Sequence, residues 1–378
     1  MKKVLKIVIS LALLLAMTAM VTACGRDDNG AATTADDDSG LSIFLISHSP
    51  PPDSTLDDGS FNQGAADGIR NFLTNNPDST WDFMQPHAGT DEARLDIFAD
   101  AIAAGADVLV LPGFHFQDVV YDAQHLFPDT YFIVLDTGPR RGGPGGEPGQ
   151  AAPNLAGILY AEHESGFLAG YATVREGFTE LGFMGGLPVP AVVRFGHGFL
   201  QGAEHAAQQM GLAPGTITVN YMYMGGFGAD PAHTATANGW YAGGTEVIFV
   251  AAGAVGFSVM EAAAAGAGRW VIGVDVDQGE NPTVITSAMK ALDNSVYTML
   301  SEIRDGRFRG GAVHRFTAAD DGVALPMHNS RFTTFTQAQY NAIFQQLATG
   351  SIRVSDLSSH DDLPTIIAGL SAVVVVEL

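Results

Sequence analysis

Short apolar runs separated by longer amphipathic stretches are the feature that most constrains how this chain folds. The runs are rich in β-branched residues and apolar on both faces, which is typical of buried parallel strands. Their alternation with helical patterns predicts right-handed βαβ units in doubly wound α/β sheets. The expected strands are 42–47, 107–113, 131–136, 180–186, 246–253 and 270–275, and the expected helices include 91–105, 163–177, 192–211, 256–268, 288–306 and 336–350.

Most of these strands run straight into Gly, Asp or Ser, and in doubly wound sheets ligands collect at the carboxyl ends of the strands. A Gly- and Pro-rich stretch, 137–154, separates the first set of strands from the second. It lacks the G-K-[ST] of a phosphate loop, so we expect a solvated surface loop. A hydrophobic content of 46% over 378 residues is enough for two α/β lobes.

The N-terminus has the pattern of an exported lipoprotein. Three lysines precede an apolar run that ends in "VTAC", which predicts a signal peptide over 1–24. A transmembrane anchor is the weaker alternative, because the run is short and a polar stretch follows it. The four residues resemble a lipobox, so we expect lipidation of Cys24. The small, acidic residues 25–40 predict a disordered tether.

Charge and cysteine content exclude several classes of function. The leader contains three lysines and no acid, and the rest of the chain has 15 basic against 41 acidic residues, a net charge of −26. That balance argues against nucleic acid or anionic lipid as a partner surface. Cys24 is the only cysteine, so the mature domain has no disulfide, thiolate nucleophile or cysteine metal site.

A search for catalytic and metal motifs predicts neither catalytic residues nor a metal or cofactor. G-x-S-x-G, H-E-x-x-H and C-x-x-C are absent from the sequence. His115, Asp118, Asp122 and His125 have roughly one-face helical spacing and could in principle hold zinc, but a solvated helix face is the better interpretation. The "EHE" at 162–164 is interpreted as the start of a surface helix.

Six segments follow one another along the chain: "DDGSFNQGAADGI" (57–69), "NLAGILYAEHESGFLAGYA" (154–172), "GFMGGLPVPAVVRFGHGFLQG" (182–202), "VIFVAAGAVGFSVMEAA" (247–263), "WVIGVDVDQ" (270–278) and "TSAMKALDNSVY" (286–297). In this order they resemble the basic membrane protein family, the purine-nucleoside-binding lipoproteins of ABC transporters. The resemblance covers about 41–353.

The resemblance implies a type I periplasmic-binding-protein fold, in which two α/β lobes joined by three strands hold a ligand between them. It also implies ABC permease and ATPase partners, a membrane contact through the lipid on Cys24, and no nucleic acid. The chain is expected to cross between the lobes near 155–161, 285–288 and 323–328. One lobe would consist of 41–157 plus 286–320, and the other of 158–285 plus 321–365. Residues 366–378 would form a tail without an assigned role.

A nucleoside needs a flat apolar slot for its base. Phe61 follows the turn-like "DDGS" at an expected helix start, so its ring can face the cleft, and Asn62 adds an amide that can read a purine edge. Phe195 and Phe227 are candidates for the opposing ring, since stacking contributes roughly 1–3 kcal/mol per base. Taken alone, each of these two is more often a core residue than a platform for a ligand.

The ribose needs directional polar groups. Asp136 and Asp275 each end an apolar strand, where a carboxylate can accept hydrogen bonds from vicinal hydroxyls. An N-cap of the following helix is the alternative for both residues. Gly253 ends another strand and would let the backbone approach the ligand.

Lys290 is the only lysine beyond the leader. It lies in the T-S-x-x-K segment, where the family's lysine contacts bound nucleoside. A compact ammonium suits a single hydroxyl or ring nitrogen, whereas the planar fork of arginine suits a bidentate partner. A solvated lysine early in a helix is the alternative.

One departure from the family pattern concerns the first strand. The family usually has an acid at the end of this strand, and here Ser47 and His48 stand in its place. One polar contact to the ligand is therefore expected to differ. The competing functions are a membrane-tethered sensor with the same cleft, a binding protein for another small polar ligand, and an enzyme such as a nucleoside hydrolase.

Overall fold

The computed structural model describes residues 40–378 except 52–53 and 144–145. The predicted signal peptide (1–24), the lipidation site Cys24 and all but the last residue of the predicted tether (25–40) lie outside the described residues. Among the described residues, no helix is both long and apolar enough to span a bilayer.

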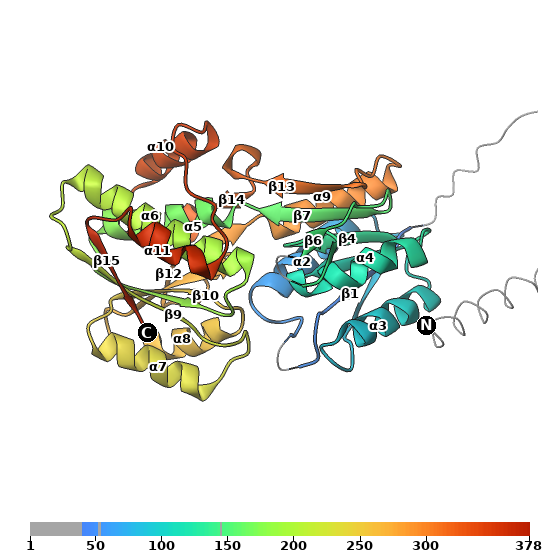
Figure 1. The fold of residues 1–378 in the computed structure, drawn as a ribbon, viewed down its shortest axis with the longest axis horizontal. Helices are drawn as coiled ribbons and strands as arrows, with labels where there is room; N and C mark the ends of the chain where they lie inside the picture. The colour runs from blue at the N-terminus through green and yellow to red at the C-terminus, as the bar shows by residue number, and fades with distance from the viewer. Residues whose placement is uncertain (1–39, 52–53, 144–145) are drawn as a thin grey trace, which may run out of the picture. The chain divides into compact units, whose positions relative to one another are not determined.

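The first lobe is built on a parallel sheet with an α-helical layer on each face (Figure 1). Apolar residues alternate between the two faces of its strands, so one set packs under α2 and α9 and the other under α3 and α4. Across the sheet the strands are β2 (Thr80–Met84), β1 (Ser42–Ile46), β3 (Val108–Pro112), β4 (Tyr131–Leu135), β7 (Leu155–Tyr160) and β13 (Ala312–Phe316). The helices are α2 (Phe61–Asn75), α3 (Asp91–Ala103), η1 (Phe114–Phe116), α4 (Gln117–Leu126) and α9 (Leu292–Arg304).

The second lobe repeats this plan around a sheet that is parallel except at β14. Helices α5 and α6 pack on one face, and α7 and α8 on the other. Across the sheet the strands are β15 (Val373–Glu377), β9 (Ile217–Tyr223), β8 (Glu180–Gly185), β10 (Val247–Ala251), β11 (Trp270–Asp275), β12 (Val284–Lys290) and β14 (Val323–Ala324). The helices are α5 (Glu162–Glu176), α6 (Pro190–Met210), α7 (Pro231–Ala242), α8 (Val255–Ala264), α10 (Gln337–Ala348) and α11 (Leu363–Ile367), with short 3-10 turns η2 (Ala318–Asp320), η3 (Met327–Asn329) and η4 (His360–Asp362).

The chain passes between the two sheets three times: after β7, after β12 and between β13 and β14. The second crossing comes later than expected from the sequence. Residues 284–290 continue as strand β12 of the second sheet, so the helix expected over 288–306 begins only at Leu292. Lys290 is therefore the last residue of a buried strand, immediately before the crossing.

Helices α5 and α6 are in backbone contact. Four glycines allow this close approach, because a Cβ at each position would overlap a carbonyl oxygen of the other helix. The glycines are Gly166 and Gly170 on α5, and Gly198 and Gly202 on α6. The N-terminal part of α6 contributes to the wall of the pocket described below, so the pairing with α5 holds part of that wall in place.

Two segments of uncertain role in the sequence have defined places in the fold. Within 137–154, β5 (Arg140–Arg141) and β6 (Glu147–Pro148) pair as a small antiparallel hairpin. In the tail 366–378, β15 forms an edge of the second sheet, parallel to β9. The buried Glu204 carboxylate accepts hydrogen bonds from the amides of Ala372 and Val373, at 2.8 and 3.0 Å, which ties this strand to α6.

Candidate ligand-binding site

A pocket lies between the carboxyl ends of the strands of the two sheets, with about 880 Å³ of free space including the part open to solvent. Small-molecule sites typically occupy about 300–1,000 Å³. Its wall contains all eight residues that the sequence singled out for ligand contact. These are Phe61, Asn62, Asp136, Phe195, Phe227, Gly253, Asp275 and Lys290.

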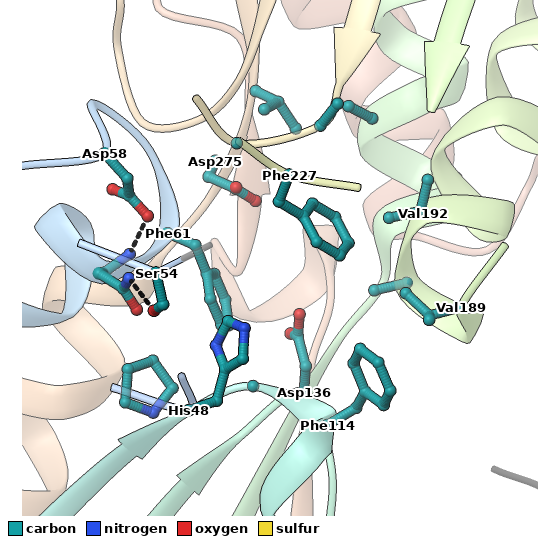
Figure 2. A pocket seen from close by; sticks show the side chains of 18 of the residues that line it. His48, Ser54, Asp58, Phe61, Phe114, Asp136, Val189, Val192, Phe227 and Asp275 are labelled. Carbon is teal, nitrogen blue, oxygen red and sulfur yellow. Dashed lines mark hydrogen bonds between the residues drawn. The ribbon is translucent and has the colours of Figure 1, made fainter. Parts of the chain in front are cut away.

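Asp136 and Asp275 occupy equivalent positions in the two lobes, directly after β4 and at the end of β11. Both have left-handed backbones, with φ of 63° and 68°. This conformation is uncommon for a residue with a side chain, and it is often associated with function when the surrounding structure enforces it. In both lobes the turn brings a carboxylate to the pocket wall (Figure 2).

Lys290 lies between these two carboxylates. Its Nζ donates to Asp136 Oδ2 at 2.9 Å and lies 3.1 Å from Asp275 Oδ1. The ammonium also lies 4.2 Å from the centre of the Phe61 ring, in a cation–π contact. The residue is only 3% exposed. Lys290 is thus not a solvated lysine: its ammonium joins an aspartate of each lobe and also lines the pocket.

The electrostatics of this cluster follow from burial and from an excess of acids. Burial raises the pKa of Asp136 to about 6, with Glu162 and Asp275 adding to the shift and Lys290 opposing it. Burial alone would lower the pKa of Lys290, but the neighbouring carboxylates outweigh it and hold this pKa above its usual value. The ammonium therefore stays charged, while Asp136 lies close to its titration point.

Glu162 and Arg194 form a second buried ion pair next to the cluster. Arg194 Nε donates to Glu162 Oε2 at 2.6 Å, and the Glu162 side chain is fully buried. The expectation that "EHE" begins a surface helix is therefore wrong. The segment begins α5 at the first crossing, where the contact with α6 covers it. Arg194, which lies 32 residues further along the chain, supplies the opposite charge that makes the burial of Glu162 possible.

The loop before α2 is held by its own side chains. The carboxylate of Asp58 accepts from the amides of Ser60, Asn62 and Gln63, and so caps the helix. The Asn62 amide donates to Ser54 Oγ at 3.0 Å and to the Thr55 carbonyl at 2.7 Å. The Asn62 NH2 group is thus engaged by the loop, so only the carbonyl oxygen of this amide is left to contact a purine edge.

The aromatic side chains differ in how far they face the pocket. Phe61, Phe227 and Phe114 surround the open space in Figure 2, and Asp136 points into it between the last two. Phe195 is only 2% exposed and packs edge-on against Phe249, so most of its ring belongs to the core of the second lobe. Phe227 is accordingly the better placed partner for Phe61.

Gly253 acts through the backbone. Its φ is 56°, and a Cβ there would lie 3.4 Å from the carbonyl oxygen of Phe227. The same carbonyl accepts from the Val255 amide at 3.3 Å. Gly253 therefore lets the segment that carries Phe227 lie against the start of α8.

The pocket wall also contains residues that the sequence did not single out for the ligand, among them His115, Phe114 and Val192. His115 was assigned to a solvated helix face, yet it lies in η1 and stacks on His48, with ring centroids 4.2 Å apart and an angle of 5°. The available signal was the position of "GFH" straight after an apolar strand. Among the described residues no group of three or more potential metal ligands is assembled.

Two hydrogen bonds near Asp275 connect the lobes. Ser60 Oγ donates to Asp275 Oδ2 at 2.6 Å, and Gln278 Nε2 donates to the Gly59 carbonyl at 2.7 Å. Asp275 is consequently held from both sides, by Ser60 of the first lobe and by Lys290.

Two α/β lobes with three crossings and a ligand-sized pocket between them define a bilobal fold of the periplasmic-binding-protein type. Solved structures agree with this class at the level of the fold. A solute-binding protein of an ABC transporter system from Aeropyrum pernix K1 superposes with a TM-score of 0.72 at 21% identity, covering 87% of this chain and 96% of that one. A solute-binding protein of an ABC transporter system from Conexibacter woesei superposes with a TM-score of 0.63 at 21% identity, covering 84% of this chain and 99% of that one. The expected type I periplasmic-binding-protein fold is confirmed.

The family follows from the sequence. The model of the family described as "ABC transporter substrate-binding protein PnrA-like" (Bmp) matches residues 52–357. The protein therefore belongs to this family, as the ordered motifs predicted. It is 25% identical to the ABC transporter nucleoside-binding protein BmpA of Lactococcus lactis over 84% of this chain and 90% of that protein. It is 26% identical to basic membrane protein D of Borreliella burgdorferi over 90% of this chain and 94% of that protein.

Membership settles the general role. The protein is a substrate-binding component of an ABC transporter, which implies a ligand together with permease and ATPase partners. The family consists of binding proteins rather than enzymes, so the expectation of a non-catalytic protein is confirmed.

Proposed function

We propose that this protein binds purine nucleosides and delivers them to an ABC permease. The observation that carries the proposal is the combination, in one pocket, of paired carboxylates from both lobes with facing aromatic rings. A nucleoside has the matching parts, a flat apolar base and a ribose with vicinal hydroxyls. A relative with 25% identity is named a nucleoside-binding protein, which also supports the proposal.

The base is assigned to the slot between Phe61 and Phe227. Stacking on aromatic side chains contributes roughly 1–3 kcal/mol per base and tolerates different bases, because every base has a π-face. Phe114 and Val192 extend the apolar wall and exclude water from the slot. Phe195 contributes only the edge that its packing in the core leaves accessible.

The ribose is assigned to Asp136 and Asp275. Each carboxylate has about four acceptor positions, and Lys290 and Ser60 occupy only some of them. Ribose hydroxyls would donate to the remaining positions. Lys290 then acts mainly by keeping both carboxylates oriented and by offsetting their charge.

The charges of the wall favour an uncharged ligand. Three carboxyl groups, those of Asp58, Asp136 and Asp275, face one ammonium, that of Lys290. A nucleoside monophosphate would bring further negative charge close to these carboxylates, and like charges in a partly desolvated site repel strongly. We therefore expect nucleosides to bind and their phosphates to be rejected.

The test is calorimetry on protein freed of any co-purified ligand. Guanosine, inosine or adenosine should bind in a 1:1 ratio with a Kd of about 1 µM or tighter, equivalent to about −8 kcal/mol. Free guanine, ribose and guanosine monophosphate should bind at least tenfold more weakly. Absence of heat with every purine nucleoside would refute the proposal.

A variant test separates the two parts of the pocket. Asp275→Asn should weaken inosine binding about ten- to a hundredfold, the size of a charge-assisted hydrogen bond. Asp277→Asn is the matched control, because Asp277 is two residues further along and does not line the pocket. Equal affinities of the two variants would remove Asp275 from the ribose site.

We also propose that the mature protein is anchored by a lipid on Cys24, at the extracytoplasmic face of the membrane. The motif "VTAC" and the acidic stretch behind it support this proposal. Cys24→Ala should abolish lipidation and move the protein to the soluble fraction, whereas Ser10→Ala, which retains the cysteine, should leave it with the membrane. A Cys24→Ala protein that stays in the membrane fraction would refute the anchor.

A further inference from the structure

A stack of three rings forms one end of the pocket. The rings of His48 and His115 are parallel and 4.2 Å apart, and the ring of Phe114 lies 3.9 Å from that of His115. His48 follows β1, and the other two rings belong to the turn after β3. In the view of Figure 2, His48 lies at the opposite end of the pocket wall from Asp275.

Both imidazoles are neutral at physiological pH. Burial, together with His115 and Arg94, lowers the pKa of His48 to about 3. Burial and Arg94 lower the pKa of His115 to about 4. The guanidinium is fixed beside the stack, because Arg94 Nε donates to the His48 carbonyl at 2.9 Å.

The ring nitrogens of this pair form no hydrogen bond within the described part of the chain. Three other polar side chains of the wall are engaged within the protein: Asp58 caps α2, Asn62 donates to the preceding loop, and Lys290 bridges two aspartates. The pair therefore has hydrogen-bonding capacity that the protein itself does not use. A neutral imidazole offers one donor and one acceptor, and either nitrogen can carry the proton.

We propose that the His48–His115 pair reads the edge of the bound base, and that it accepts both 6-oxo and 6-amino purines. This inference rests on the proposed nucleoside function. A 6-oxo purine presents a donor at N1 and an acceptor at O6, while a 6-amino purine presents the reverse. An imidazole matches either edge by changing its tautomer, whereas a carboxylate offers acceptors only. The pair therefore allows the pocket to accept either an oxo or an amino group at C6 of the purine.

The experiment compares three nucleosides by calorimetry: inosine, adenosine and purine riboside, which lacks a substituent at C6. Wild-type protein should bind inosine and adenosine within about tenfold of each other, and purine riboside about three- to tenfold more weakly, which is the size of one neutral hydrogen bond. An inosine-to-adenosine ratio above a hundredfold in either direction would overturn the proposed tolerance.

His48→Phe and His115→Phe keep an aromatic ring in the stack and remove the polar atoms. In at least one of them the preference for inosine and adenosine over purine riboside should fall to within twofold. His48→Gln and His115→Gln retain a donor and an acceptor. Each should therefore keep at least half of the wild-type preference over purine riboside, measured as the logarithm of the ratio of dissociation constants. The ratio is measured within each variant, so loss of folded protein does not affect it.

The outcomes separate the two proposals. If wild-type protein binds no nucleoside, the proposed function fails and this inference with it. If it binds nucleosides and neither phenylalanine variant changes the preference for a C6 substituent, only the role of the histidine pair is overturned.

Discussion

Replacement of Lys290 by methionine is expected to destabilise the protein far more than loss of an ordinary lysine would. The ammonium lies within 3.1 Å of Asp136 and Asp275, and it is 3% exposed. Methionine keeps most of the stem's packing but leaves two buried carboxylates facing each other without a counter-ion. Removal of one partner of a buried ion pair costs about 3–5 kcal/mol, so we expect a loss of that size in the free energy of unfolding.

The pH dependence of this loss has a definite sign. Burial already raises the pKa of Asp136 to about 6, and without Lys290 this pKa should rise further. The unfolded chain keeps an ordinary carboxyl pKa near 3.8. The cost of an ionised Asp136 is therefore present at pH 7.5, and it is relieved as the pH falls through the folded-state pKa. The Lys290→Met penalty should be clearly smaller at pH 5.

Urea unfolding followed by tryptophan fluorescence measures both effects. Arg307→Met is the control, because Arg307 pairs with Asp305 at an exposed site and should change stability by less than about 1 kcal/mol. Adding Asp136→Asn to Lys290→Met should recover part of the loss, as expected for directly coupled residues. A loss below about 1 kcal/mol for Lys290→Met at pH 7.5 would refute the account of a buried bridging ammonium.

Two further predictions concern titration and helix packing. Inosine affinity should fall as the pH drops through about 6, because a protonated Asp136 accepts fewer hydrogen bonds. The Asp136→Asn variant should bind inosine weakly and show no such pH dependence. A wild-type affinity that does not change between pH 5 and pH 7.5 would contradict the assignment. Gly170→Ala should lower the free energy of unfolding by about 1–3 kcal/mol, because its Cβ meets the carbonyl oxygen of Phe199 on α6. Gly239→Ala, in an open position of α7, should instead stabilise by about 0.4–1 kcal/mol, and equal effects of the two substitutions in chemical denaturation would refute the packing argument.

The strands of the two lobes could be predicted from the sequence because their signal is local. A run such as "DVLVLPG" is apolar at every position, and residues 108–112 are indeed buried on both faces as β3. The same rule failed at 288–306. "SAMK" looks amphipathic when read into the following helix, yet its backbone pairs with β11. Pairing with a distant strand decided the conformation there, and the sequence nearby contains no sign of it.

The place of the two aspartates was also predictable, since a polar residue after a buried strand lies at the ligand edge of such a sheet. The partners of the two carboxylates within the protein could not be predicted. Lys290 is 154 residues from Asp136, and Ser60 is 215 residues from Asp275. Sequence therefore identified Lys290 as unusual but gave no sign of the two aspartates that its ammonium contacts.

Burial of charge was hidden for the same reason. "EHE" is hydrophilic by composition, and only the backbone contact of α5 with α6 shows why Glu162 is covered and why Arg194 must accompany it. The histidine stack was equally inaccessible. His48 and His115 lie in different loops, and an isolated histidine after a strand gives no indication of a partner.

The bonds of Asp275 connect binding with the relative position of the lobes. Its two oxygens are held by Ser60 of the first lobe and by Lys290 at the crossing, and Gln278 reaches the Gly59 carbonyl beside them. Any separation of the sheets must break the Ser60 and Gln278 bonds and expose a carboxylate that a ribose hydroxyl would use. A ligand that donates to Asp275 therefore adds a bond to a group already placed by both lobes. Its affinity depends on that placement as much as on its own contacts, so Ser60→Ala should weaken inosine binding although Ser60 does not line the pocket.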